Sequence, residues 1–524
     1  MNSSMTRLAA AVVAGGALLT GGIIAPAGAQ ASAAGPSTAQ ASPGLSGAQR
    51  ADLLSMARDT WRFFQTDVDP VTHLPLDNVG PGDARGTYTS AANVGTYLWA
   101  VTSAYDLKII DRHEATREIS ATLGEVAKLK RSYGFLYQWY DTGTGLVIPN
   151  PGTTQSCADD PTAATDNCSF LSAVDNGWYA SGLIVVRNAF PELRPLANAL
   201  IAPMDFSIFY DNRAQTACNV NAAIDSQPTG QMYGGYYVGT GPAGYHNGAL
   251  YSDPRIAMYV GMGLHQMPGD VWWRTWRTLP PQQCATDPDF SWQGQGTPQG
   301  YWTTIRDPQS GKPFRVWEGH YTYPGTGLKF LPTYNGGMFE ALMALQVVPE
   351  TSWGPRGFGL ADQRTVQVQQ AYASQLGYPV WGMSPSSTPD DSGGYSAYGA
   401  QGLAFPTGQQ LAQGPCPTCT PSPESAVTPH ASFLALTVAP QRAYQNIKAL
   451  QRLYPGVYSK DGGFYDAVSP STGSVGHRRL VLDQSMIMAA LDNSLNGGRL
   501  QGYYAQDPVG RIAKEYLEVE KMSL

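Results

Sequence analysis

Charged side chains are scarce in this chain of 524 residues. Lys, Arg, Asp and Glu make up 14% of it, against about 25% in an average soluble domain, and the formal net charge is −7. A negative chain with few basic residues is not attracted to nucleic acid or to anionic membranes, which argues against both as partners. Aromatic residues are plentiful by comparison, with 12 Trp and 29 Tyr. This combination favours an uncharged ligand that stacks on aromatic rings, and a neutral glycan is the leading candidate.

Long apolar runs are missing outside the N-terminus. Residues 8–24 form an apolar run that follows a basic residue, and small residues at Ala27 and Ala29 provide a signal-peptidase site. The run is short and rich in Gly, and no basic stop-transfer residues follow it, which disfavours a membrane anchor. We expect residues 1–29 to be a secretory signal peptide and residues 30–46 a flexible low-complexity spacer. The mature protein is then secreted, and we expect a monomer.

Cysteine is also scarce, with six residues in the whole chain. An even number in an exported protein indicates disulfides. Close spacing favours two local pairs, Cys157 with Cys168 and Cys416 with Cys419. The second pair has the CxxC spacing of redox and zinc sites, but its Pro-rich setting has neither a second CxxC nor a nearby His pair. A disulfide is therefore the preferred interpretation.

Helical periodicity dominates the chain from Ser46 onward, and no alternation of strands with helices is visible. Ser46 and Asp111 stand where helix N-caps are expected, and apolar residues recur at helical spacing after them. The expected helical segments are residues 46–64, 94–105, 111–129, 178–189, 256–264, 338–348, 364–376, 430–436, 441–453, 482–491 and 512–517.

These segments predict one domain over residues 47–524. A coiled coil is disfavoured because no heptad pattern persists along the sequence. A two-domain architecture is disfavoured because the sequence has no exposed polar segment that would join two domains. The simplest architecture that remains is a closed array of helical hairpins. We therefore predict an all-α fold, an (α/α)6 barrel or toroid, whose long loops form a cleft and whose catalytic groups lie where helices begin or end.

Familiar catalytic signatures are missing too. The chain has no GxSxG, HExxH, Walker or strand-linked GxGxxG motif, which disfavours serine, zinc, nucleotide and dinucleotide chemistry. No pattern calls for a cofactor or a metal. What remains are carboxylates in aromatic, Gly-rich surroundings, where burial can raise a carboxyl pKa into the range of a general acid. These acids are Asp141, Asp175, Asp253, Glu340, Glu424, Asp466 and Asp483.

Capping and ion pairing offer a structural alternative for single members of this set. Asp175 and Asp483 precede helical runs as N-caps do, Asp253 can pair with Arg255, and Glu340 can bond backbone. A structural role for all seven is harder to reconcile with their similar surroundings. We interpret the set as a candidate site.

Short segments that contain these acids resemble, in the same order, the glucoamylase-like domain and, more specifically, the endo-β-1,2-glucanases of glycoside hydrolase family 144. The resemblance spans residues 50–505 and implies an inverting hydrolase on an (α/α)6 barrel. The matching segments are LP (74–75), TSAANVG (89–95), WYDT (139–142), VDNG (174–177), SDPRIA (252–257), GMFE (337–340), WG (381–382), VTPHA (427–431), GFYDA (463–467) and DQ (483–484).

Inverting hydrolysis needs a carboxylic acid that protonates the leaving oxygen and a carboxylate that activates water, typically about 6.5 to 9.5 Å apart. By position in the family's segments, the resemblance makes Asp253 the acid and Glu424 the base. The family normally has Glu as the acid and Asp as the base, so the two types are exchanged here. Either the cleft has moved to suit, or the roles differ.

Other residues are expected to bind substrate. Asp175, Glu340 and Asp466 would position sugar hydroxyls or water, and His246 and His430 would donate hydrogen bonds, although a lone His is more often structural. The aromatic residues would stack on sugar, although most Trp side chains serve as core. The rest of the expected set is Asp141, Arg255, Trp139, Tyr140, Trp178 and Trp381.

The leading hypothesis is therefore a secreted glycoside hydrolase of an extracellular polysaccharide or oligosaccharide, with β-1,2-glucan as first substrate. The exchanged acids motivate one alternative, a non-catalytic glycan-binding protein on the same scaffold. Hydrolysis of a different glycan is another. A polysaccharide lyase would need a Tyr or His base beside cationic groups, which the acidic chain disfavours.

Overall fold

Six helices in the interior of the fold carry few charges and are buried on nearly every side. The computed structural model describes residues 44–153, 155–158, 166–212, 230–247, 249–278, 298–334, 336–400, 404–405 and 426–524, which lie in one unit, Ser42–Leu524. A helix that is apolar all round must be buried, so these six form the centre. They are α2 (Ala91–Asp106), α4 (Ala173–Ala189), α7 (Arg255–Gly263), α9 (Met338–Leu342), α13 (Pro429–Leu434) and α15 (Val481–Asn496).

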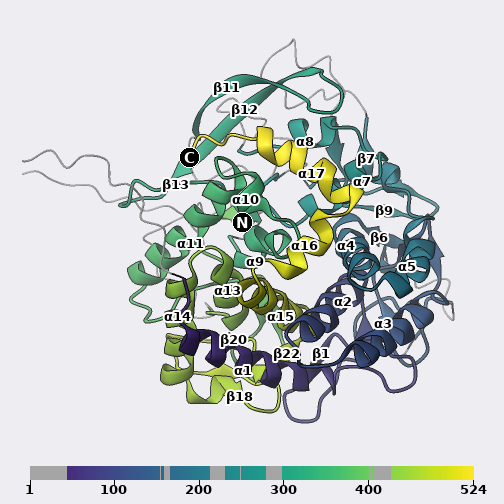
Figure 1. The fold of residues 1–524 in the computed structure, drawn as a ribbon, viewed down its shortest axis with the longest axis vertical. Coiled ribbons are helices and arrows are strands. Elements are labelled where there is room, and N and C mark those ends of the chain that lie inside the picture. Colours follow the sequence, from purple (N-terminus) through teal and green to yellow (C-terminus); the bar gives the residue numbers. More distant parts are fainter. Residues whose placement is uncertain are drawn as a thin grey trace, which may run out of the picture. The chain divides into compact units, whose positions relative to one another are not determined.

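The inner helices follow one another around a closed ring. Helix α2 packs on α4, α4 on α7, α9 on α13, α13 on α15, and α15 returns to α2 (Figure 1). Between α7 and α9 the link is the side chain of Arg255, which donates hydrogen bonds to the carbonyl oxygens of Glu340 and Ala341 at 3.2 and 2.5 Å. The described helices thus form an α/α toroid.

Amphipathic helices cover the ring. In α14, for example, the buried residues Ala443, Asn446, Ile447 and Leu450 recur every three or four positions and so lie on one face. The longer outer helices are α1 (Gly47–Phe64), α3 (Arg112–Val126), α5 (Arg194–Ile201), α11 (Phe358–Gln375), α14 (Pro440–Leu453) and α17 (Pro508–Val519). Shorter ones are α8 (Asp270–Arg274), α10 (Glu350–Trp353) and α16 (Arg499–Ala505).

Glycines allow the first three inner helices to approach closely. A Cβ atom on Gly182 of α4 would lie 2.3 Å from the carbonyl oxygen of Gly95 in α2, and one on Gly177 would lie 2.8 Å from the backbone nitrogen of Ala257 in α7. Real Cβ atoms cannot come so near to backbone, because protein interiors are already close-packed. Part of the glycine content is therefore needed for the tight spacing of the ring.

In the described ranges, strands are short and lie in the loops, except for one antiparallel hairpin in which Trp302 pairs with Trp317. That hairpin consists of β11 (Gln299–Arg306) and β12 (Pro313–Thr322), with β13 (Lys329–Phe330) at its edge. In one three-stranded sheet, β9 (Gly235–Tyr237) lies between β6 (Phe170–Ser172) and β10 (Gly241–Pro242). The two-stranded sheets pair β1 (Asn78–Val79) with β22 (Arg479–Leu480), β2 (Tyr88–Thr89) with β5 (Tyr140–Asp141), β3 (Arg131–Ser132) with β4 (Phe135–Leu136), and β7 (Tyr210–Asp211) with β8 (Gln231–Met232). Further two-stranded sheets pair β14 (Thr333–Tyr334) with β17 (Ala404–Phe405), β15 (Ser386–Ser387) with β16 (Tyr395–Ser396), β18 (Tyr458–Ser459) with β19 (Gly463–Phe464), and β20 (Ala467–Val468) with β21 (Val475–Gly476).

Each expected helical segment has a counterpart in the structure. The Ser46 hydroxyl accepts from the backbone N–H of Gln49 and the Asp111 carboxylate from that of Glu114, so both predicted caps are confirmed. Helices α5, α8, α10 and α16 were not predicted, since each is too short to show a clear period. The all-α prediction is right in its helical content but misses the β11–β12 hairpin.

The structure also bears on the cysteines and on the N-terminus. Cys157 and Cys168 form a disulfide, with Cα atoms 5.6 Å apart, as expected. Cys416, Cys419, the expected signal peptide at 1–29 and most of the expected spacer lie outside the described residues. Within the described ranges, no helix combines the length and the apolar character needed to cross a bilayer.

Candidate active site

Four of the seven predicted acids lie at the N-terminal ends of the inner helices. Asp175, Glu340 and Asp483 stand in the first turns of α4, α9 and α15, and Asp253 lies two residues before α7. Asp175 and Asp253 interact electrostatically, and so do Asp253 and Glu340. Residues that are far apart in the sequence are thus gathered where helices begin, as the sequence predicts.

Asp253 and Glu340 form a carboxyl pair. They hydrogen-bond each other, the Ser252 hydroxyl donates to Glu340 Oε2 at 3.0 Å, and the indole of Trp178 hydrogen-bonds Asp253. Asp253 is partly exposed, whereas Glu340 is buried behind it. Burial raises the pKa of Asp253, and burial together with the negative charge of Asp253 raises the pKa of Glu340 well above its usual range. The pair therefore holds a proton that a lone carboxylate would release.

Asp175 lies beside this pair and is not a helix cap. The cap of α4 is Ser172, whose hydroxyl accepts from the backbone N–H of Asp175, so the cap interpretation is wrong. Gln138 donates to Asp175 Oδ2 at 3.0 Å. Burial, supported by the charge of Asp253, raises the pKa of Asp175 to about 6. Its carboxyl group is therefore not used for capping and interacts with the Asp253–Glu340 pair.

A second acidic group lies at the start of α15. Asp466 accepts from the Ser387 hydroxyl at 2.9 Å and from the Leu480 backbone N–H at 3.2 Å. Asp483 Oδ2 is 3.1 Å from Nδ1 of His430, and the cap of α15 is Leu480, so Asp483 is not a cap either. Burial and the charge of Asp483 raise the pKa of Asp466 well above its usual range.

Tyr395 connects the two groups, although the sequence did not single it out. Its side chain is 58% exposed, yet crowding by surrounding atoms raises its pKa, and the charges of Asp483, Glu340, Asp77 and Asp253 raise it further. Tyr395 is thus an exposed side chain within electrostatic range of carboxylates from both groups. The surrounding sequence, SGGYSAYG, has no acid or helical period that would have identified it.

Asp77 was also missed. Its carboxylate accepts from the side-chain amides of Asn93 and Asn78, both at 2.9 Å. Asp77 acts electrostatically on Asp483 and so belongs to the second group. It follows a loop without aromatic neighbours, and only its proximity in space to α2 and α15 brings it to the site.

Three of the expected substrate-binding residues lie inside the protein with partners of their own. Arg255 is fully buried in an ion pair with Glu350. His246 Nε2 lies 2.8 Å from Asp211 Oδ2. The Tyr140 hydroxyl donates to the carbonyl oxygen of Lys130 at 2.6 Å. These contacts leave little of the three side chains for a sugar.

The remaining expected residues are half-buried or packed. Trp178 packs edge-on against Trp99 in the core. Trp139 and Asp141 are half-buried, and the Asp141 carboxylate accepts from the backbone N–H and the hydroxyl of Thr144. Trp381 is half-buried beside α14.

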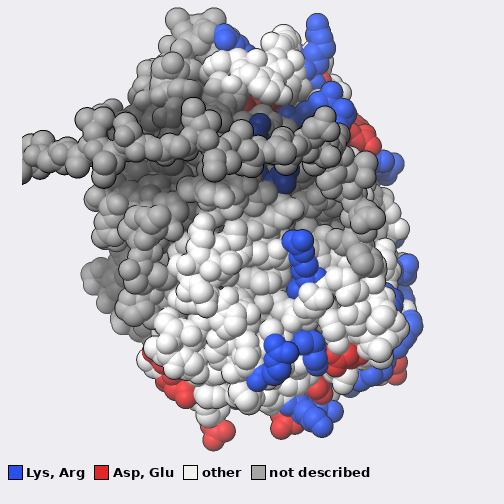
Figure 2. All heavy atoms as spheres, turned by 90° about the vertical axis from the view of Figure 1, so that its left-hand side faces the viewer, with Lys and Arg blue, Asp and Glu red and all other residues white. Residues whose placement is uncertain are grey.

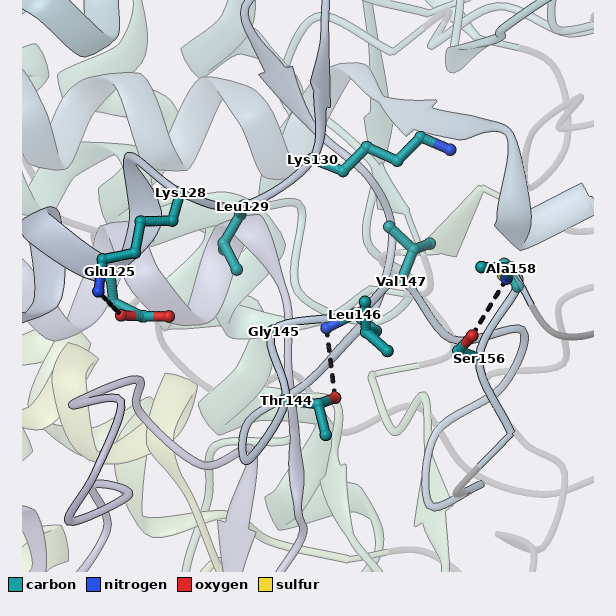
Figure 3. Close-up of a pocket in the computed structure, with 11 residues that line it drawn as sticks. Glu125, Lys128, Leu129, Lys130, Thr144, Gly145, Leu146, Val147, Ser156 and Ala158 are labelled. Atoms are coloured by element: carbon teal, nitrogen blue, oxygen red, sulfur yellow. Dashed lines mark hydrogen bonds and ion pairs between the residues drawn. The ribbon is translucent and has the colours of Figure 1, made fainter.

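Glu424, the expected base, lies outside the described residues. Within the described part of the chain, no three His, Cys, Asp or Glu side chains are arranged to hold a metal ion. A separate cavity of about 350 Å³ lies beside the end of α3 (Figure 3). Lys128 and Glu125 form an ion pair at its wall, and no aromatic ring lines it. The chemistry therefore points to the helix ends and not to this cavity.

The described surface shares the low charge of the sequence. On the face in Figure 2, most described atoms belong to uncharged residues, and the charged ones are scattered, mainly along the upper, right-hand and lower edges. An uncharged ligand suits such a surface.

Comparison with known proteins agrees with this arrangement. Residues 314–507 match the family model described as "Putative glucoamylase". Residues 55–241 match a second model, a protein family of unknown function, DUF3131. A curated relative, the cyclic β-(1,2)-glucan synthase NdvB of Rhizobium meliloti (strain 1021), is 29% identical over 138 residues. That match covers 26% of this chain and only 4% of the length of NdvB.

Solved structures share the fold over most of the chain. A putative glucoamylase from Bacteroides fragilis NCTC 9343 has a TM-score of 0.60 and 17% identity, covering 93% of this chain and all of the other. The endo-β-1,2-glucanase of Chitinophaga pinensis, in complex with sophorotriose and glucose, has a TM-score of 0.60 and 15% identity over 89% of this chain and 98% of its own. The β-1,2-glucanase of Parabacteroides distasonis has a TM-score of 0.63 and 13% identity, over 90% and 60%. The resemblance to glucoamylase-like proteins and endo-β-1,2-glucanases is confirmed.

Proposed function

We propose that this protein is a glycoside hydrolase that cleaves a neutral glucan, with β-1,2-glucan as its first substrate. The observation that carries the proposal is the Asp253–Glu340 pair, which stores a proton beside the further carboxyl group of Asp175. A general acid is most effective when its pKa lies near the working pH, and burial of a carboxyl pair is a way to reach that range. The fold shared with the endo-β-1,2-glucanase of Chitinophaga pinensis supports the substrate.

We propose an inverting mechanism with Asp253 as the general acid. Asp253 is the partly exposed member of its pair and donates a proton to the glycosidic oxygen as the C–O bond breaks. Glu424 takes a proton from water, which attacks the opposite face of the sugar. Asp175 and Asp466 orient sugar hydroxyls or that water.

The ring geometry supports a finer description of the fold. We propose that the six inner helices and the outer helices that follow them form the six hairpins of an (α/α)6 barrel. In such a barrel the N-terminal ends of the inner helices meet at one end, which is where the acids lie. Export is part of the same proposal, and the secreted protein is expected to begin at Gln30.

The decisive experiment is incubation with linear and cyclic β-1,2-glucan, other glucans, an arabinan and a mannan, followed by product sizing and polarimetry. We expect cleavage of β-1,2-glucan with inversion at the anomeric carbon. If only another glycan is cleaved, the protein is still a glycoside hydrolase, but β-1,2-glucan is not its substrate. Tight binding of an oligosaccharide without any product would favour the glycan-binding alternative, which the exchanged acids motivate.

Two variants test the roles. Asp253→Asn and Glu424→Gln should each reduce kcat by about 100-fold or more, because general acid and base catalysis typically contribute about 10² to 10⁴. The control is Asp111→Asn, since Asn caps a helix as well as Asp does and α3 is an outer helix. Near-full activity of Asp253→Asn would contradict its assignment as the acid.

A further inference from the structure

We propose that Glu340 is a positioning residue that acts through Asp253: it holds the proton that Asp253 delivers to the glycosidic oxygen. The inference rests on the hydrolase function proposed above. It gives Glu340 a different role from the sugar contact that the sequence predicts.

The relative exposure of the two carboxyl groups supports this role. Glu340 is only 5% exposed, whereas Asp253 is partly exposed. The Glu340 carboxyl contacts the segment before α7, through the Ser252 hydroxyl at 3.0 Å and the carboxyl of Asp253. A sugar that reaches this site therefore meets Asp253, the more exposed of the two, before Glu340.

Arg255 fixes the two groups relative to each other. Its Nη1 atom donates to the carbonyl oxygens of Ser252 and Glu340, at 2.9 and 3.2 Å, and its Nη2 atom donates to that of Ala341. The guanidinium is held in turn by both carboxylate oxygens of Glu350. A buried cation thus ties the loop that carries Asp253 to the first turn of α9, which pre-organises the pair.

Two carboxylates in hydrogen-bond contact cannot both ionise easily, so the pair retains one proton over a wide pH range. The groups that face it are Asp175 from α4, Arg255 from α7, Tyr395 from β16 and the neutral indole of Trp178. The hydrogen bond from Glu340 lowers the pKa of Asp253, whereas the one to Asp253 raises the pKa of Glu340. Glu340 is also the more deeply buried of the two, so a negative charge is less favourable on it than on Asp253, and the shared proton rests on Glu340.

The proton count balances through the reaction. As the glycosidic C–O bond breaks, Asp253 delivers the single proton of the pair to the leaving oxygen, and Glu340 supplies that proton to Asp253. The pair has then lost one proton, and the base that deprotonated the attacking water has gained one. Exchange of that proton with solvent restores both groups, so no other reactant is needed.

The test is the pH dependence of kcat/KM in three variants. Glu340→Gln keeps a hydrogen-bond donor but has no proton to share, so the alkaline limb should move to lower pH by about one unit or more and kcat should fall about tenfold, with KM nearly unchanged. Glu340→Asp should recover part of the activity. Ser252→Ala removes a donor that lowers the pKa of Glu340, so its alkaline limb should move to higher pH.

Asp492→Asn is the matched control. Asp492 is also a buried carboxyl hydrogen-bonded to a second acid, Asp106, but it lies nine residues after Asp483 on α15, away from the helix start. This variant should leave the pH profile of activity unchanged. If it shifts the profile as Glu340→Gln does, the effect is general and the proposal is wrong.

The outcomes separate this proposal from the function itself. An active wild type with an unshifted profile in Glu340→Gln, or with a raised KM and unchanged kcat, would overturn the role of Glu340 and leave the hydrolase in place. A wild type that cleaves no glycan refutes the hydrolase. In that case the pH dependence of unfolding tests the pair. The free energy of unfolding of the wild type should fall as pH rises through the pKa of the pair, and Glu340→Gln should lack that fall. If Glu340→Gln does not fold, Ser252→Ala decides by the direction of its shift.

Discussion

Arg255 of α7 and Glu350 of α10 form a two-point ion pair in which neither side chain is exposed. Nε lies 2.7 Å from Oε1 and Nη2 2.8 Å from Oε2, and the Tyr259 hydroxyl donates to Oε1 at 2.7 Å. The same guanidinium holds the carbonyl oxygens beside the proposed acid. The two charges depend on each other, because removal of either partner would leave the other charge buried without water.

Glu350→Gln should therefore destabilise the protein strongly. Removing one partner of a buried pair typically costs about 3 to 5 kcal/mol, because the remaining charge is uncompensated. Urea unfolding at neutral pH measures the effect. Glu192→Gln is the control, since Glu192 pairs with Arg112 and both side chains are nearly half exposed, so its loss should cost less than about 1 kcal/mol. Equal effects of the two variants would contradict the prediction.

Asp175→Asn should stabilise the protein at neutral pH and reduce its activity. The folded pKa of about 6 lies above the ordinary value, so the native state binds more protons than the unfolded state between about pH 4 and 6, and stability falls as pH rises through that window. An Asn cannot ionise, so the variant should gain about 1 to 3 kcal/mol above the window and nothing below it. Urea unfolding at several pH values checks this. A gain that does not depend on pH would refute it.

Tyr395 should contribute to substrate binding through its ring. Tyr395→Ala should raise KM about tenfold, which corresponds to about 1.4 kcal/mol, whereas Tyr395→Phe should bind nearly as well as the wild type. Tyr301→Ala on β11 is the matched control, because Tyr301 is 54% exposed and Tyr395 58%. Steady-state kinetics on the glucan that the protein cleaves measures all three. Equal KM values for the two Ala variants would remove Tyr395 from the site.

Gly182→Ala should disturb the ring itself. The added Cβ would lie 2.3 Å from the carbonyl oxygen of Gly95, so α2 and α4 must separate, and overpacking of this kind costs about 1 to 3 kcal/mol. Gly124→Ala on the outer helix α3 meets no atom within 4 Å and should instead stabilise by about 0.5 to 1 kcal/mol. In thermal unfolding, the midpoint temperature should fall in Gly182→Ala and rise in Gly124→Ala. An undiminished midpoint in Gly182→Ala would show that the contact between α2 and α4 is not tight.

Helices were readable from the sequence because their signals are local. The cap at Ser46, the cap at Asp111 and the apolar period of residues 441–453 depend only on neighbours in the chain. The short helix α10 and the pairing of β11 with β12 depend on contacts with distant residues, and so they were missed. The acids of the site were found by their aromatic, Gly-rich surroundings, but the cap interpretation of Asp175 failed because Ser172 caps α4 instead.

Composition, periodicity and capping are properties of the chain alone, and they predict a helix-rich protein of low charge with a short set of acids where helices begin. How those acids are grouped depends on the folded structure. Folding buries Glu340 more deeply than Asp253, turns Arg255 inward to Glu350, and brings Asp77 and Tyr395 within electrostatic range of the site acids. Burial and proximity set the proton affinity of a carboxyl, and neither is specified until the inner helices close into a ring.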